Sequence, residues 1–128
     1  MKNILVILNH NLSNEQMRDL FKISGCKINF KYLSDELQLK WANISAEANE
    51  DYINDIANEF FNYIISQDVY TVIIQGESGI TYRLITMLKI KDIICLYACT
   101  KRVSKDIKNA DGVVEKKSEF QHVRFRKY

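Results

Sequence analysis

Proline is absent from this chain of 128 residues, and only three cysteines and four glycines are present. No linker, repeat or low-complexity stretch divides the sequence, so we expect a single domain over residues 1–128. The cysteines, Cys26, Cys95 and Cys99, are too few for a disulfide scaffold and lack the C-x-x-C spacing of a metal site. This sparse use of cysteine favours a reducing compartment, and we expect a cytoplasmic protein.

Long apolar runs and familiar catalytic motifs are also missing. No hydrophobic stretch approaches the roughly 20 residues that cross a membrane, and the opening residues 1–3 do not resemble a signal peptide. The sequence has no H-E-x-x-H, no clustered carboxylates for two metal ions and no G-x-S-x-G. Any reaction is therefore expected to need no metal and no cofactor, and to depend on hydrogen-bond donors, imidazole and positioning.

The charge is unevenly distributed along the chain. Residues 1–100 carry 9 Lys and Arg against 12 Asp and Glu, a net of −3, whereas residues 101–128 carry 9 against 4, a net of +5, which together give the formal +2. Such an excess attracts an anionic partner. It is too small for a non-specific binder of duplex DNA, so a compact anion is the better fit.

Apolar runs alternate with helical periodicity over residues 1–100. Ser13 and Gln16 form a capping box for a helix over residues 14–24, and Gly25 is placed to end it. Ser34 caps a short helix, and a long helix begins near Ser45 or Ala46. Strands are predicted over residues 4–8, 28–33, 69–75 and 92–98. This order predicts an α/β fold with a mostly parallel sheet flanked by helices.

The pattern changes after residue 100. Residues 101–108 and 113–128 flank an Asp-Gly turn and predict a basic C-terminal β-hairpin attached to the core of residues 1–100. Strand alternation then puts His122, Arg124 and Arg126 on one face, and Val123 and Phe125 on the other. A cationic row with an imidazole suits a polyanion or a phosphodiester. The alternative is a solvated edge strand whose charges discourage pairing.

Polar residues follow the predicted parallel strands, where ligands of open α/β sheets bind. The glycines of the turn over residues 76–79, with the helix that follows, could bind a phosphate, or could form a plain strand-to-helix turn. Glu77 could accept a hydrogen bond from a ribose or a base. Trp41 is expected in the core, with nucleobase stacking as the alternative. The candidates after the first, third and fourth strands are Asn9 and His10; Gln75, Gly76, Glu77, Ser78 and Gly79; and Thr100, Lys101 and Arg102.

Together these segments resemble a family of small stand-alone CRISPR-associated proteins, the ring nucleases of type III systems, which have a CARF-like, Rossmann-type fold. The resemblance rests on Asn9-His10, on Gln75-Gly76-Glu77-Ser78-Gly79, on Thr100-Lys101-Arg102 and on His122-Val123-Arg124-Phe125-Arg126, and includes Trp41-Ala42-Asn43-Ile44. It implies a homodimer that takes part in antiviral defence by cleaving cyclic oligoadenylate, with cyclic tetra-adenylate as the expected ring. A two-fold symmetric ring suits a two-fold symmetric protein.

The reaction implied is attack of a ribose 2′-hydroxyl on the adjacent phosphate, which leaves a linear product with a 2′,3′-cyclic phosphate. His122 is favoured for proton transfer because it shares its predicted strand face with the arginines, and His10 is the other candidate. Arg124, with Arg126 or Lys101 and N–H groups near Gly76, would stabilise the charge that develops on the phosphoryl oxygens. The residues that the resemblance implies for substrate binding are Asn9, Gln75, Gly76, Glu77, Ser78, Gly79, Thr100, Lys101, Arg102 and Arg126. This arrangement requires the C-terminal hairpin to fold back over the crevice.

Two other functions are compatible with the same residues. A module that sequesters the ring without cutting it would use the same donors, so the sequence does not separate binding from cleavage. A general single-stranded RNA-binding protein would bind its RNA through the basic hairpin. Competition by linear oligoadenylate as effective as that of the ring would favour the RNA-binding protein.

Overall fold

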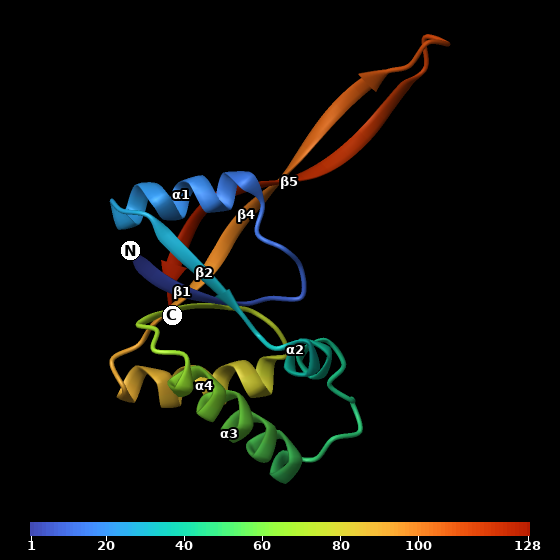
Figure 1. The fold of residues 1–128 in the computed structure, drawn as a ribbon. Helices are drawn as coiled ribbons and strands as arrows, with labels where there is room; N and C mark the ends of the chain where they lie inside the picture. Colours follow the sequence, from blue (N-terminus) through green and yellow to red (C-terminus); the bar gives the residue numbers. More distant parts are fainter.

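A computed structural model describes residues 1–128 as a five-stranded sheet flanked by helices, with strand order β2-β1-β3-β4-β5 (Figure 1). The first four strands of this order are parallel, and β5 pairs antiparallel with β4. The predicted α/β class and the mostly parallel sheet are therefore confirmed. The strands are β1 (Lys2–Ile7), β2 (Ile28–Tyr32), β3 (Thr71–Ile74), β4 (Ile94–Lys108) and β5 (Val114–Lys127).

Local capping signals place most helices where the sequence predicts them. Ser13 accepts a hydrogen bond from the N–H of Gln16, whose side chain accepts from the N–H of Ser13, and Gly25 ends the helix at φ +67°. The long helix begins later than predicted, because Asn49 rather than Ser45 or Ala46 caps it. The helices are α1 (Asn14–Ser24), α2 (Asp35–Ala42), α3 (Glu50–Ser66) and α4 (Ser78–Ile90).

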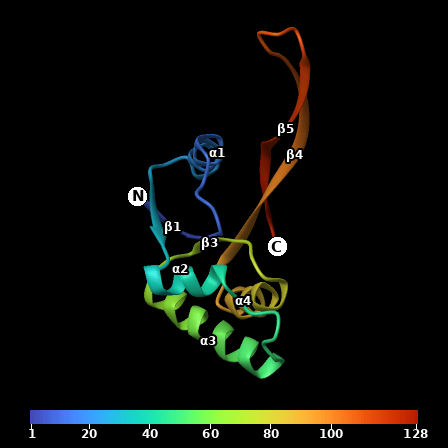
Figure 2. The same ribbon diagram turned by 90° about the vertical axis from the view of Figure 1, so that its right-hand side faces the viewer.

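The helices cover the two faces of the sheet unequally. Helix α1 packs on one face, and α2, α3 and α4 pack on the other (Figure 1, Figure 2). Leu5 and Ile7 of β1 face the three-helix side, whereas Ile4 and Val6 face α1. Alternate residues of β1 therefore enter different cores, as expected for a strand buried on both faces.

Trp41 belongs to the larger core. Its side chain is 2% exposed and packs edge to face on Phe60, with ring centroids 5.2 Å apart. Its Nε1 donates to the carbonyl of Gln75 at 3.2 Å. A Cβ atom built on Gly76 would lie 2.4 Å from the indole ring. The core interpretation of Trp41 is thus confirmed, and Gly76 is required by this close approach of the indole.

The C-terminal hairpin is antiparallel, as predicted, but it does not fold back over the molecule. Strand β4 continues without a break from the body of the sheet to Lys108, and β5 returns from Val114. Both views show the far part of this ribbon extending away from the body (Figure 1, Figure 2). We call residues 101–121 the arm. Only the base of the arm adjoins the rest of the protein.

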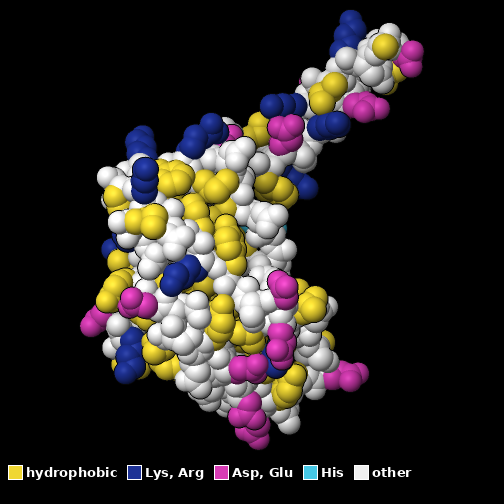
Figure 3. Space-filling model, viewed as in Figure 1, with side chains coloured by type: hydrophobic (Ala, Val, Ile, Leu, Met, Phe, Trp, Pro, Cys, Tyr) yellow, Lys and Arg dark blue, Asp and Glu magenta, His cyan; other side chains and the backbone are white.

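No helix of the structure combines the length and the apolar character that crossing a bilayer would take. Acidic side chains gather over the end of the molecule that carries α2 and α3, lysines and arginines lie around α1, and the arm carries charges of both signs (Figure 3). The end that carries α1 and the arm is therefore less negative than the other end, which favours an anionic ligand there.

Candidate functional site

A polar cavity of about 690 Å³ lies between the start of α1 and the base of the arm. It brings together residues from four parts of the chain that the sequence separates widely. Four of the predicted site residues, His10, Gln75, Thr100 and His122, line it. The other lining residues are Asn11, Ser13, Asn14, Glu15, Gln16, Arg18, Ala98 and Phe120.

The strand order explains why the cavity forms at this position. Strand β2 pairs with one edge of β1, and β3 pairs with the other edge of β1. The loops after β1 and β3 consequently diverge to opposite faces, which opens a crevice at the carboxyl end of the sheet. His10 and Gln75 are the lining residues that follow these two strands.

The amino end of α1 forms one wall of this cavity. The capping box already satisfies the N–H groups of Ser13 and Gln16. Asn14 and Glu15 carry the first N–H groups of the helix, which have no acceptor inside a helix. Arg18 follows one turn later and lines the same cavity. This wall therefore combines a guanidinium with the positive end of a helix dipole, and both favour an anion.

His10 is the exposed imidazole of the site. Its Nδ1 lies 3.0 Å from the carbonyl oxygen of Asn11. A carbonyl can only accept, so Nδ1 carries the hydrogen and Nε2 of the neutral ring is left as an acceptor. His10 also borders a neighbouring cavity of about 340 Å³ that Asn9 lines. Its geometry is that of a group able to remove a proton from a bound ligand.

His122 differs from His10 in its burial and in its hydrogen bonds. Its side chain is only 6% exposed, and its Nε2 lies 2.8 Å from Oδ2 of Asp19 on α1. The other ring nitrogen, Nδ1, is buried and has no hydrogen-bond partner in the protein. His122 therefore lines the cavity while one nitrogen is engaged by Asp19 and the other is shielded from water.

The predicted row of His122, Arg124 and Arg126 on one face of the strand is wrong. Cys99 pairs with Arg124, but Thr100 pairs with His122, so the register shifts and Val123 is the extra residue of a β-bulge. The bulge turns His122 to the face of Phe125, with ring centroids 4.9 Å apart.

The two arginines lie on the opposite face of the sheet. Arg126 pairs with Tyr97 and Arg124 with Cys99, and these strand positions alternate with Leu96 and Ala98, which pack towards α1. A hydrogen bond with Tyr97 raises the pKa of the Arg126 guanidinium above its usual value. Neither arginine lines the cavity of its own chain.

The glycine turn after β3 does not present a free anion site. Glu77 caps α4, and its carboxylate accepts hydrogen bonds from the N–H groups of Gly79 and Ile80, both at 2.9 Å. The protein's own carboxylate thus occupies the helix end that the sequence suggested for a phosphate. Gly76, Ser78 and Gly79 do not line the cavity either. The plain strand-to-helix turn is the correct interpretation of residues 76–79.

Lys101 and Arg102 do not end a strand at the sheet edge as expected. They continue β4 into the arm, where Lys101 pairs with Gln121 and Arg102 with Phe120. Thr100 lines the cavity, whereas Lys101 and Arg102 lie outside its wall. The fourth strand, predicted over residues 92–98, and the first hairpin arm, predicted over residues 101–108, are one continuous strand, whose backbone is satisfied by pairing with β5.

Three functional candidates are missed by the sequence reasoning: Arg18, Asp19 and Phe120. Arg18 follows Asn14 by four residues, a spacing that puts both on one face of a helix. Phe120 precedes His122 by two residues, which puts both on one face of a strand. These spacings could have suggested the two residues. Nothing local indicates the contact of Asp19 with His122, which joins residues 103 positions apart.

Comparisons with known proteins identify the family. Residues 2–126 match the family described as "Uncharacterized protein MJ1673 family". The chain belongs to the MJ1673 family. One relative within it, "Uncharacterized protein MJ1673" from Methanocaldococcus jannaschii, is 35% identical over 131 residues, covering 100% of this chain and 98% of the relative. No solved structure matches the chain. Neither description names an activity.

Proposed function

We propose that this protein binds cyclic oligoadenylate and cleaves it to linear products without a metal ion, as a CARF-like ring nuclease of type III CRISPR defence. The observation that supports this proposal best is the cavity that unites His10, Arg18 and the amino end of α1. These groups offer a proton acceptor, a permanent cation and unpaired N–H donors. A phosphodiester with an adjacent hydroxyl is a ligand that can use all three.

The proposed reaction needs only groups of the ligand and the protein. Nε2 of His10 accepts the proton of a ribose 2′-hydroxyl while its oxygen bonds to the adjacent phosphorus. The bond from phosphorus to the 5′-oxygen breaks, and that oxygen takes up the proton that His10 accepted, relayed through water, so His10 returns to its neutral form. Arg18 stabilises the charge on the phosphoryl oxygens. Alignment of the three reacting atoms contributes as well, since positioning supplies up to about 7–11 kcal/mol.

The size of the cavity supports a complex in which two protein chains share one ring of cyclic oligoadenylate. Cavities of roughly 300–1,000 Å³ take ligands of the size of a drug, which is about one or two nucleotides. The cavity of about 690 Å³ falls in this range, whereas cyclic tetra-adenylate contains four nucleotides. A cytoplasmic homodimer with one cavity for each half of the ring would accommodate it.

Incubation of the protein with radiolabelled cyclic tri-, tetra- and hexa-adenylate in EDTA tests this proposal. We expect a linear product with a 2′,3′-cyclic phosphate, in molar excess over the protein, from the tetra-adenylate ring. The His10→Gln variant is the matched control, because it keeps a polar side chain but cannot transfer the proton. Failure of all three rings to yield product beyond the amount of protein would refute the nuclease.

Sequestration of the ring without cleavage is the second candidate, and the state of His122 favours it. Both nitrogens of this imidazole are kept from the cavity, which leaves His10 as the sole histidine able to move a proton there. Tight retention of the intact ring, with no product, would establish sequestration instead of cleavage.

A further inference from the structure

We propose that Phe120 and Arg102 form a stacking platform for a nucleobase at the mouth of the cavity. Phe120 lines the cavity, and yet its side chain is 74% exposed. It contributes to neither hydrophobic core. Single exposed aromatic side chains are common on protein surfaces, but this one lies in the wall of the polar cavity, where its ring face is open to a ligand.

Arg102 fixes the position of this ring. The two residues are directly opposite each other in the β4–β5 register. The Cζ atom of Arg102 lies 5.7 Å from the centroid of the Phe120 ring, within the range of a cation–π contact. Pairing with Arg102 restricts the motion of an otherwise free aromatic side chain, and it puts a cation next to the surface on which a base would stack.

A nucleotide matches this pair better than other ligands do. Every nucleobase presents a flat π face that stacks on an aromatic ring, and its phosphate can pair with a nearby guanidinium. Gln75 lines the same cavity, and its side-chain oxygen already accepts the N–H of Ala98 at 3.0 Å. Its amide NH₂ is therefore the group left to donate to the edge of a base.

This inference rests on the proposed function and deepens it, because it assigns the group that recognises the base rather than the phosphate. Two probes distinguish recognition of the base from recognition of the phosphate: a linear adenylate trinucleotide and a trinucleotide of abasic ribose phosphates. Both carry the same phosphates, and only the first can stack. Phe120→Trp supplies a fluorescent ring at the platform, since the native Trp41 is buried.

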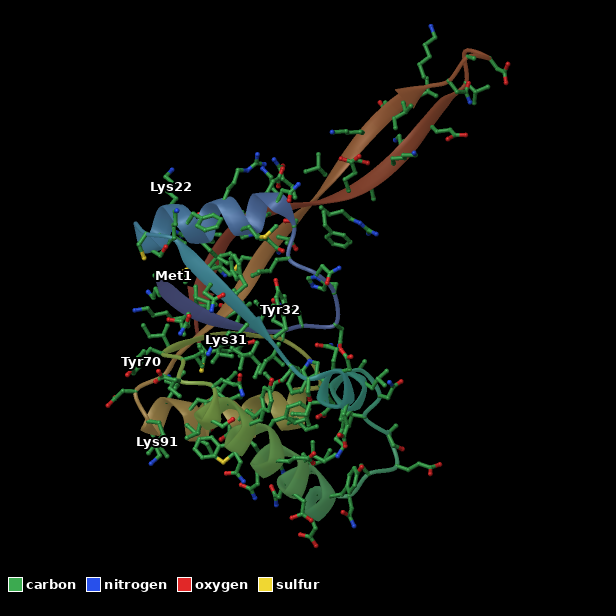
Figure 4. All side chains as sticks on the ribbon, viewed as in Figure 1. Met1, Lys22, Lys31, Tyr32, Tyr70 and Lys91 are labelled. Atoms are coloured by element: carbon green, nitrogen blue, oxygen red, sulfur yellow. The ribbon has the colours of Figure 1, made fainter.

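We expect the fluorescence of the Phe120→Trp variant to change with the adenylate probe and not with the abasic probe. Phe120→Leu, which keeps an apolar side chain without a π face, should bind the adenylate probe about tenfold more weakly than the native protein. Tyr70→Leu is the matched control. Tyr70 is 71% exposed and precedes β3, at the end of the body away from the arm (Figure 4). The Tyr70→Leu variant should bind the adenylate probe as tightly as the native protein does.

Two outcomes overturn the platform alone: adenylate binding unchanged in Phe120→Leu, or an equal response of Phe120→Trp to both probes. In either case cleavage of the ring by the native protein would still stand. If the native protein neither binds adenylate nor cleaves any ring, the proposed function fails and the platform fails with it. Thermal melting of Phe120→Leu should match the native protein, because the exposed ring does not enter a core.

Discussion

Nε2 of His122 lies 2.8 Å from Oδ2 of Asp19, so an imidazole at the base of the arm is tied to α1. The partners come from β5 and from the helix that borders the cavity. The contact therefore joins the two walls between which the cavity opens. Its geometry sets His122 apart from His10, whose imidazole is exposed and contacts only the carbonyl of Asn11.

The two histidines should respond differently to substitution. His10→Gln should lower turnover of the ring by a factor of about 10²–10⁴, with little change in affinity, because the group that accepts the proton is lost. His10 is exposed, so the thermal stability should not change. Single-turnover kinetics and equilibrium binding measure the two effects. Unchanged turnover in His10→Gln would remove His10 from the reaction.

Asp19→Ala should destabilise the protein by about 1–3 kcal/mol, because it leaves the buried imidazole of His122 without its partner. Urea unfolding measures this change. The exposed pair of Lys40 and Glu59, at 3.0 Å, supplies the control, since Glu59→Ala should leave the free energy of unfolding nearly unchanged. Equal effects of the two substitutions would contradict a special role for the contact of Asp19 with His122.

Glu77→Ala tests whether this residue caps a helix or contacts the ligand. Loss of the two hydrogen bonds at the start of α4 should cost about 0.5–2 kcal/mol of stability. Glu77→Asp, which keeps a carboxylate able to cap, should recover most of it. Affinity for the ring should stay the same in both variants. A weaker affinity without loss of stability would instead assign Glu77 to the ligand.

Gly76→Ala should be strongly destabilising because of the indole of Trp41. The added methyl group would lie 2.4 Å from the ring, so the core must shift at a cost of about 1–3 kcal/mol. Gly79→Ala is the control, because its Cβ would lie 3.2 Å or more from its nearest neighbours, the side-chain ends of Glu77 and Arg83. Chemical denaturation of both variants checks the difference. Similar midpoints would show that Trp41 can move aside.

Alkaline pH should destabilise the protein through Cys95. Burial raises the pKa of its thiol from 9.0 to about 11. Below pH 9 the thiol is protonated in both the folded and the unfolded chain, so stability is unaffected. Between pH 9 and 11 the unfolded chain releases the proton first, and stability should fall by about 1–2 kcal/mol.

Unfolding measured at pH 8 and pH 11 checks this prediction, and Cys95→Ala should reduce the loss. Burial also raises the pKa of the Tyr128 phenol, so some alkaline loss should remain in that variant. An alkaline loss of the same size in Cys95→Ala and the native protein would refute the assignment to Cys95.

The local elements of this fold could be predicted because their causes are local. The capping box of Ser13 and Gln16, the left-handed Gly25 and the alternation of strands with helices depend on residues a few positions apart. The same is true of the hairpin turn near Gly112. Because β1 and β3 are parallel strands of one sheet, His10 and Gln75, which follow them, could be expected at the same edge of the sheet.

Only the tertiary structure decided which residues form the site. A single extra residue, Val123, reverses the side-chain alternation between His122 and Arg124, and no local pattern fixes where a bulge falls. Pairing with β5 extends β4 through Lys101 and Arg102, so that neither residue lines the cavity wall. Contacts such as that of Asp19 with His122 depend on how α1 packs against the sheet. Packing over long sequence distances, rather than local propensity, therefore selected the groups that share the cavity.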